Sequence, residues 1–128
     1  MVLLLVMKYL ERNQQVVLNS KEAEWCYRFA CYVKGANVEA LTNVVLGSKN
    51  PHYKYLCARD IPQIQPDFDI TPLEDSILEL ESTKWSNQFL YNVKGSRKEL
   101  HQGVIQKNEA KSLAKRMARV VSGLKKSS

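Results

Sequence analysis

The chain repeats itself at a regular spacing, and this internal repetition limits its fold more than any other feature of the sequence. The segment VLNSKEAEWCYRFACYVKG, which starts at Val17, realigns with the segment VLGSKNPHYKYLCARDIPQ at Val45 after a shift of 28 residues. A third copy follows after a further 32 residues, and a fourth after 28 more, at the end of the chain. Periods of this length are typical of helical repeat proteins. The sequence therefore predicts about four degenerate copies of one helical unit.

Each unit is expected to be an αα-hairpin, because helix boundaries recur within it. Asn37 can cap a helix whose apolar residues share one face, and Asn50 before Pro51 is typical of the start of a second helix. Residues 71–74 and 96–99 each have the spacing of a capping box, in which a hydroxyl and a carboxylate bond free backbone N–H groups of the first turn. The helix ends are marked by glycines that are expected to adopt a positive φ: Gly35, Gly95 and Gly123.

The second helix of each hairpin is expected to be largely buried. In the first unit it carries an apolar series at helical spacing: Trp25, Phe29, Ala30 and Val33. Successive hairpins would stack with these helices between neighbours. The predicted fold class is therefore all-α, either a short solenoid of stacked αα-hairpin repeats or an irregular helical bundle. One domain over residues 1–128 is expected, with units at about 17–44, 45–76, 77–103 and 104–124 and a basic tail at 125–128.

The unit pattern V-I/V-L-x-S-x-x-x-x-W/Y-x-Y-x-F-A-x-x-V-K-G-A-N-V-x-x-L resembles a short tandem αα-hairpin repeat of uncharacterised bacteriophage and bacterial proteins. The resemblance covers roughly residues 17–123 and is best in the first unit. It implies a repeat scaffold and a bacterial-virus setting. It supplies no catalytic residue.

Cysteine and histidine do not form a recognisable metal or catalytic site in the sequence. The three cysteines, Cys26, Cys31 and Cys57, include no CxxC pair and lie in aromatic-rich runs, where a thiol packs as a small apolar group. His52 and His101 have no ligand at helical spacing beside them and are interpreted as surface or helix-end residues. We therefore expect a protein without enzymatic activity, metal or cofactor.

The apolar run at residues 2–7 is too short for a signal sequence or a membrane span. We expect no membrane partner and a cytoplasmic location, which is the bacterial host cytoplasm if the protein is viral.

Positive charge is concentrated at one end of the chain. Residues 97–128 hold nine Lys and Arg against two acidic residues, whereas residues 1–96 hold ten against eleven. Within the last helix, four basic residues recur every four positions and so line one face. Part of this charge favours the helix dipole, and a basic face that only aids solubility is the alternative. The predicted site for a partner or for phosphate groups is Lys107, Lys111, Lys115, Arg116, Arg119, Lys125 and Lys126.

Residues 60–81 carry the opposite charge, with seven acidic residues and no Lys or Arg. The Asp67-Phe68-Asp69 sequence lacks the glycine and the distal glutamate of a calcium loop. An acidic contact surface, for example for the basic helix of another copy, is the preferred interpretation. Its predicted members are Asp67, Asp69, Glu74 and Asp75.

Three functions fit this sequence. The leading hypothesis is a non-enzymatic interaction protein of phage type that binds a bacterial host protein and inhibits or redirects it. The second is an accessory protein that binds nucleic acid regardless of sequence through the basic helix. The third is a structural protein that assembles from many copies, in which case a homo-oligomer is expected.

Overall fold

The fold is all-helical. We describe a computed structural model, which defines the backbone of residues 2–127 and the side-chain surroundings of residues 8–124. Residues 2–127 contain helices and no strand, which confirms the predicted all-α class. The helices are α1 (Val2–Ser20), α2 (Ala23–Tyr32), α3 (Val38–Gly47), α4 (Pro51–Ile64), α5 (Thr71–Leu78), α6 (Thr83–Asn92) and α7 (Lys98–Ser127).

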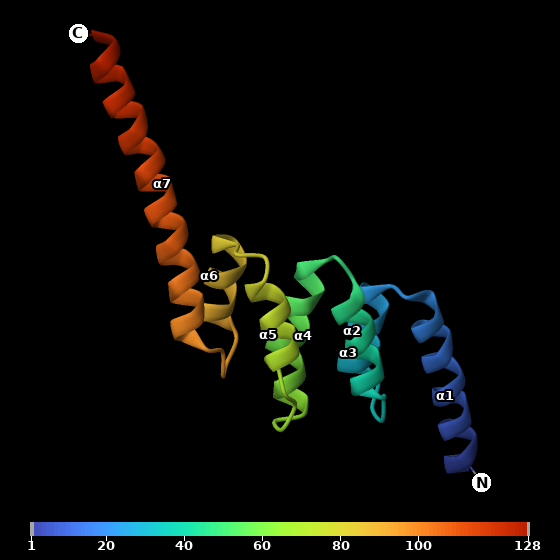
Figure 1. Cartoon of the computed structure of the whole chain (residues 1–128). Coiled ribbons are helices and arrows are strands. Elements are labelled where there is room, and N and C mark those ends of the chain that lie inside the picture. The colour runs from blue at the N-terminus through green and yellow to red at the C-terminus, as the bar shows by residue number, and fades with distance from the viewer. Residues whose placement is uncertain (1, 128) are drawn as a thin grey trace.

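The helices lie side by side in an elongated molecule, with α1 at one end and α7 at the other (Figure 1). The most extensive contacts join α2 to α3, α4 to α5 and α6 to α7. In addition, α4 contacts both α2 and α6, while α1, α3, α5 and α7 contact one another in that order. Each helix therefore packs mainly on its neighbours along the long axis, and α7 is supported from one side only.

The core is formed by one face of each of the central helices. Its fully buried apolar side chains include Leu41 of α3, Ile61 of α4, Leu73 and Ile77 of α5, and Phe89 of α6. Burying an apolar side chain of this size contributes roughly 1.5–3 kcal/mol. The helix pairs are therefore held together mainly by apolar packing.

Free thiols take part in this packing. Cys26 and Cys57 are buried and Cys31 is half-buried, and none of the three forms a disulfide. Burial raises the pKa of Cys31 to about 11, and it also raises the pKa of Cys26 and of Cys57. The thiols are therefore neutral at physiological pH and pack as small apolar groups, as predicted.

Several predicted helix boundaries are confirmed. The Asn37 side chain accepts a hydrogen bond from the backbone N–H of Ala40 at the start of α3, and Asn50 accepts one from His52 at the start of α4. Gly35 and Gly95 have φ values of 84° and 83°. A side chain at either position would be strained there, which accounts for glycine.

The two predicted capping boxes do not form. Thr71 lies inside α5, and its backbone N–H donates to Asp69 instead. The Glu74 side chain points into the protein rather than back to the helix start, and the Ser96 hydroxyl donates to the carbonyl of Phe89. Glu74 is therefore used in a tertiary contact, and Ser96 bonds the end of α6 instead of the start of α7.

The buried face predicted for α2 is right only in part. Ala30 is buried and Phe29 packs on the core, but Trp25 is half exposed under the guanidinium of Arg28, whereas Cys26 and Tyr27 are buried. The buried face of α2, which packs on α3 and α4, therefore includes Cys26 and Tyr27 instead of Trp25.

The fourth predicted unit, residues 104–124, does not form a hairpin. Residues 98–127 are one continuous helix, so the boundary expected near residue 103 is absent and Gly123 lies inside α7 instead of ending it. No proline interrupts this segment, and Ala, Lys, Leu, Met and Arg dominate it. These residues favour an uninterrupted helix.

Among the described residues, no helix is both long and apolar enough to span a membrane. The side chains of the apolar run at residues 2–7 lie outside the described part.

The packing of the core can be tested by truncating one buried leucine. Leu41→Ala is expected to lower the free energy of unfolding by about 2–5 kcal/mol, because it removes apolar contacts and leaves a cavity. Leu80→Ala makes the same chemical change at a half-exposed position, and it should lower the free energy of unfolding by much less than Leu41→Ala does. Urea unfolding followed by circular dichroism measures both, and equal losses would contradict this description of the core.

Candidate interaction surface

Helix α7 is attached to the protein by its first half. The side-chain amide of Asn108 donates to the backbone carbonyl of Glu81 and to the hydroxyl of Thr83, at 2.9 Å each. Lys107 forms an ion pair with Glu81 at 3.1 Å. Every residue from 109 to 124 is exposed, and this half of α7 extends beyond the other helices (Figure 1). We call residues 109–124 the projecting segment.

The side chains of the projecting segment are exposed, so little tertiary packing holds it in a helix. Isolated helices of this length are marginal in water, so the segment depends on residues of high helix propensity and on continuity with the anchored half. A partner that packs on it would stabilise it further.

One face of the projecting segment is apolar. Leu113, Met117, Val120 and Val121 are between 48% and 58% exposed. Their spacing places them within about 100° of the helix circumference. We call these four residues the apolar stripe. A continuous exposed apolar stripe on a charged helix is typical of a surface that docks on another molecule.

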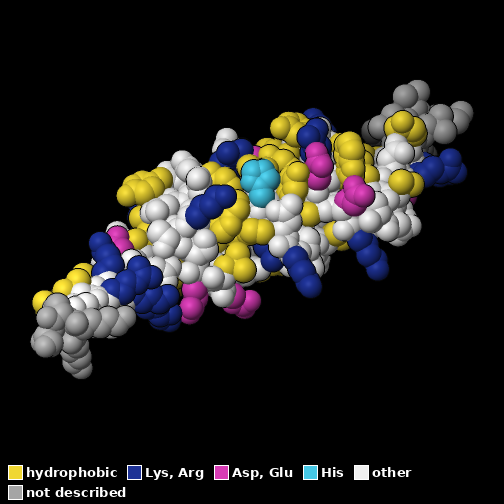
Figure 2. Space-filling model, turned by 90° about the horizontal axis from the view of Figure 1, so that it is seen from above, with side chains coloured by type: hydrophobic (Ala, Val, Ile, Leu, Met, Phe, Trp, Pro, Cys, Tyr) yellow, Lys and Arg dark blue, Asp and Glu magenta, His cyan; other side chains and the backbone are white. Residues whose placement is uncertain are grey.

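The predicted basic site is only partly assembled as expected. Lys111, Lys115, Arg116 and Arg119 are exposed, and dark blue side chains gather near this end of the molecule in Figure 2. Lys107 is engaged by Glu81. The side chains of Lys125 and Lys126 lie outside the described residues.

The helix geometry separates the basic residues into two groups. At about 100° per residue, Lys115 and Arg119 lie on the side of α7 away from the apolar stripe, while Arg116 and Lys111 border its apolar face on either side. Sequence reasoning identified the basic line, but it interpreted three residues of the apolar stripe, Leu113, Met117 and Val121, as core positions of the fourth repeat unit, whereas they are exposed. The signal was present in the sequence, because the four residues of the apolar stripe recur at helical spacing.

The predicted acidic surface divides into exposed and buried parts. Asp67, Asp69 and Asp75 are exposed, as expected. Glu74 is only 1% exposed, so its assignment to a contact surface is wrong. It is buried because α6 and α7 close over α5 at this point.

Glu74 lies at the centre of a buried polar network. Its Oε2 accepts from the backbone N–H of Arg97 at 2.8 Å and lies 2.9 Å from Nε2 of His101. Its Oε1 accepts from Nε of Arg97 at 2.6 Å. On the other side of the imidazole, Nδ1 lies 3.2 Å from the hydroxyl of Ser86. The network therefore ties α5, α6 and α7 together.

The row of serine, histidine and glutamate has the residue types of a hydrolase triad, but its burial excludes that role. Ser86 and His101 are 0% exposed and Glu74 is 1% exposed, so no substrate can reach the hydroxyl. His101 lies in the first turn of α7, at a helix end as predicted, but it is buried rather than at the surface. No sequence signal joins it to Glu74, because the two residues are brought together only where α7 crosses α5.

A second network joins α2 to α4. The hydroxyl of Tyr27 donates to the Asp60 carboxylate, and Arg59 donates to the same carboxylate from Nε at 2.7 Å and from Nη2 at 3.0 Å. Partial burial opposes the charge, but the hydrogen bonds from Arg59 and Tyr27 outweigh it and lower the pKa of Asp60. The ionised carboxylate therefore stabilises the contact between these helices.

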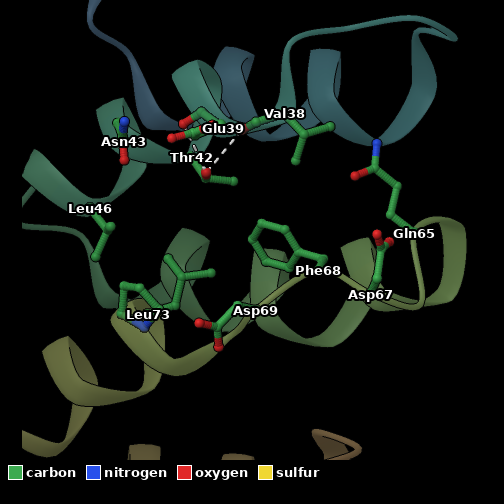
Figure 3. Close-up of a pocket in the computed structure, with 11 residues that line it drawn as sticks. Val38, Glu39, Thr42, Asn43, Leu46, Gln65, Asp67, Phe68, Asp69 and Leu73 are labelled. Atoms are coloured by element: carbon green, nitrogen blue, oxygen red, sulfur yellow. Dashed lines mark hydrogen bonds between the residues drawn. The ribbon is translucent and has the colours of Figure 1, made fainter.

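An acid-lined groove lies between α3 and the segment that joins α4 to α5 (Figure 3). Its volume is about 410 Å³. We call this cavity the acidic groove. Its apolar lining consists of Val38, Leu46, Phe68, Pro72 and Leu73, and its acidic side chains are Glu39, Asp67 and Asp69.

Among the described residues, no group of three or more His, Cys, Asp or Glu side chains is arranged to hold a metal ion. Comparison of the chain with protein-family models, with curated proteins and with solved structures gives no match. The resemblance to a phage-type repeat therefore stays a prediction.

The buried network predicts unequal roles for two neighbouring carboxylates that both pair with Arg97. Glu74→Ala should lower the free energy of unfolding by about 3–5 kcal/mol, because it leaves the buried imidazole of His101 and the backbone N–H of Arg97 without their partner. Asp75→Ala removes an exposed partner and should cost about 1 kcal/mol or less. Denaturant unfolding of both variants measures the difference, and a small effect of Glu74→Ala would show that the network does not hold α7.

The lowered pKa of Asp60 predicts an acid-dependent loss of stability. Its contribution is present above the unfolded-state pKa, about 3.9, and is lost as the pH falls through the lower folded-state value. Asp60→Asn should therefore be less stable than wild type near neutral pH, and the two should converge in acid. Unfolding curves from neutral pH into acid test this, and a gap that stays constant with pH would contradict it.

Proposed function

We propose that this chain is a non-enzymatic interaction protein that binds an acidic partner protein through the projecting segment of α7. One observation carries the proposal: every residue from 109 to 124 is exposed although the segment bears the apolar stripe. Leaving that stripe in water is unfavourable, and a groove on a partner would cover it. Amphipathic helices dock into apolar grooves through anchors at this spacing.

The remainder of the chain is proposed to act as a short scaffold of stacked αα-hairpins. Helices α2, α4 and α6 begin at residues 23, 51 and 83, and these intervals equal the shifts of 28 and 32 residues in the sequence. The contacts of α4 with both α2 and α6 also support a stack. In this proposal the scaffold ends in α7 and presents it to the partner.

The chemistry of the projecting segment favours a protein over nucleic acid. Phosphate groups would engage Lys111, Lys115 and Arg119, but they would leave the apolar stripe in water. A partner protein with an apolar groove and an acidic rim could contact both the apolar stripe and the basic residues beside it, since Arg116 and Lys111 border the apolar face. Lys115 and Arg119 would then accelerate association by long-range attraction rather than by contact.

The setting of this interaction is proposed from the sequence. The resemblance to phage and bacterial repeats favours a bacterial host protein in the cytoplasm as the partner. A helix seated in a functional groove of such a protein would inhibit or redirect it.

The apolar stripe can be tested with variants that add equal charge. Leu113→Asp together with Met117→Asp should abolish capture of the partner from a bacterial lysate, because two carboxylates would enter the apolar contact. Ser112→Asp with Ser122→Asp adds the same charge on the polar side of the same helix and should retain capture in moderate salt. Affinity purification followed by mass spectrometry, with and without nuclease, measures the outcome.

The result separates the proposed function from its alternative. Equal capture by both double variants would contradict docking through the apolar stripe. Nucleic acid that co-purifies, together with loss of all captured protein on nuclease treatment, would favour the nucleic-acid function. Lys115→Glu with Arg119→Glu should slow partner association and leave the dissociation rate less affected, which surface plasmon resonance can measure.

A further inference from the structure

The acidic groove combines an apolar floor with carboxylates on both of its walls. Val38 and Leu73 form part of the floor, and Phe68 points into the groove (Figure 3). Glu39 lies on α3 at one wall, and Asp67 lies on the opposite wall, in the segment between α4 and α5. Within the described part of the chain, neither of these two carboxylates has an ion-pair partner. The groove is therefore suited to an apolar group that carries positive charge on both sides.

The projecting segment has the complementary arrangement. The apolar stripe is continued around the helix by alanines at positions 110, 114 and 118. Arg116 borders this extended face on one side, where Glu109 lies beside it, and Lys111 borders it on the other, so a cation is present on each side of the apolar residues. The groove volume of about 410 Å³ can accept a few large side chains of such a helix, rather than the helix itself.

We propose that the acidic groove binds the projecting segment of a second copy of this chain. The proposal rests on the function proposed above, namely that this segment is a docking helix, and it names a further partner for it. The helix must come from another molecule, because α7 of the same chain starts beyond α5 and α6 and projects away from α3 (Figure 1). Charge complementarity and the match of apolar faces carry the assignment.

This contact joins two different surfaces and is therefore heterologous. Each copy offers one helix and one groove, so binding can continue from copy to copy in an open chain or close into a ring. A projecting segment seated in a neighbour's groove cannot bind another protein at the same time. Self-association and partner binding are consequently mutually exclusive.

Two variants with complementary defects test this contact. The groove variant carries Glu39→Lys and Asp67→Lys, and the helix variant carries Leu113→Asp and Met117→Asp. Each alone is expected to lose self-association, because one half of the contact is missing. Mixed in equal amounts, they should form a heterodimer and nothing larger, since only one intact helix and one intact groove remain. Sedimentation velocity over a range of concentrations measures these masses.

A matched control and a charge exchange make the test specific. Glu11→Lys with Glu79→Lys adds the same charge at exposed positions outside the groove. This variant should self-associate as strongly as the wild-type protein. Lys111→Glu with Arg116→Glu should weaken self-association. Mixing that variant with the groove variant should give assemblies larger than a heterodimer, because the basic helix meets an intact acidic groove and the acidic helix meets the basic groove. Circular dichroism establishes that each variant is folded.

Several outcomes would overturn the proposal. Wild-type protein that stays monomeric at every concentration would do so, as would self-association that the groove variant retains, or a mixture of the two complementary variants that forms no heterodimer. The proposed function fails separately. If the wild-type protein does not self-associate but the helix variant loses partner capture, the proposed function stands and the contact between copies is ruled out. If self-association depends on the groove but no partner protein is captured, the contact between copies stands and the proposed function is ruled out.

Discussion

The position of α7 depends on a single buried carboxylate. Glu74 accepts hydrogen bonds from the backbone and the guanidinium of Arg97 and pairs with His101, and all three contacts reach across from α5 to the start of α7. A buried charge is tolerated only when its partners satisfy it, so this arrangement fixes the direction in which α7 leaves the protein. The projecting segment extends in the same direction because α7 is one continuous helix.

The two halves of α7 differ in what stabilises them. The anchored half is held by the buried network and by the bonds of Asn108, whereas residues 109–124 are exposed and depend mainly on helix propensity. A helix that is fixed at its base and exposed beyond it presents its side chains in a defined orientation without covering them. This arrangement lowers the entropic cost of docking, because the segment is already helical before it meets a partner.

The chain carries two surfaces of opposite charge that both have apolar centres. The projecting segment is basic at its borders, and the acidic groove has Glu39 and Asp67 on its walls. They lie on different parts of an elongated molecule, so neither surface neutralises the other within one copy (Figure 1). We propose that this separation lets the projecting segment bind either a partner protein or a second copy of the chain. The local concentrations of the partner and of the chain itself then decide which one is bound.

Local sequence determined the helices, and tertiary contacts determined which of their faces became buried. The caps at Asn37 and Asn50 and the glycine at Gly35 were predictable, because each depends on residues next to it in the chain. The basic line on the last helix was equally predictable, since every fourth residue shares a helix face. The burial of Glu74 and His101, 27 residues apart, was not. It arises where α7 crosses α5, and no local pattern encodes such a crossing. For the same reason the sequence could not reveal that the side chains of residues 109–124 are exposed, because their exposure depends on which part of α7 the other helices cover.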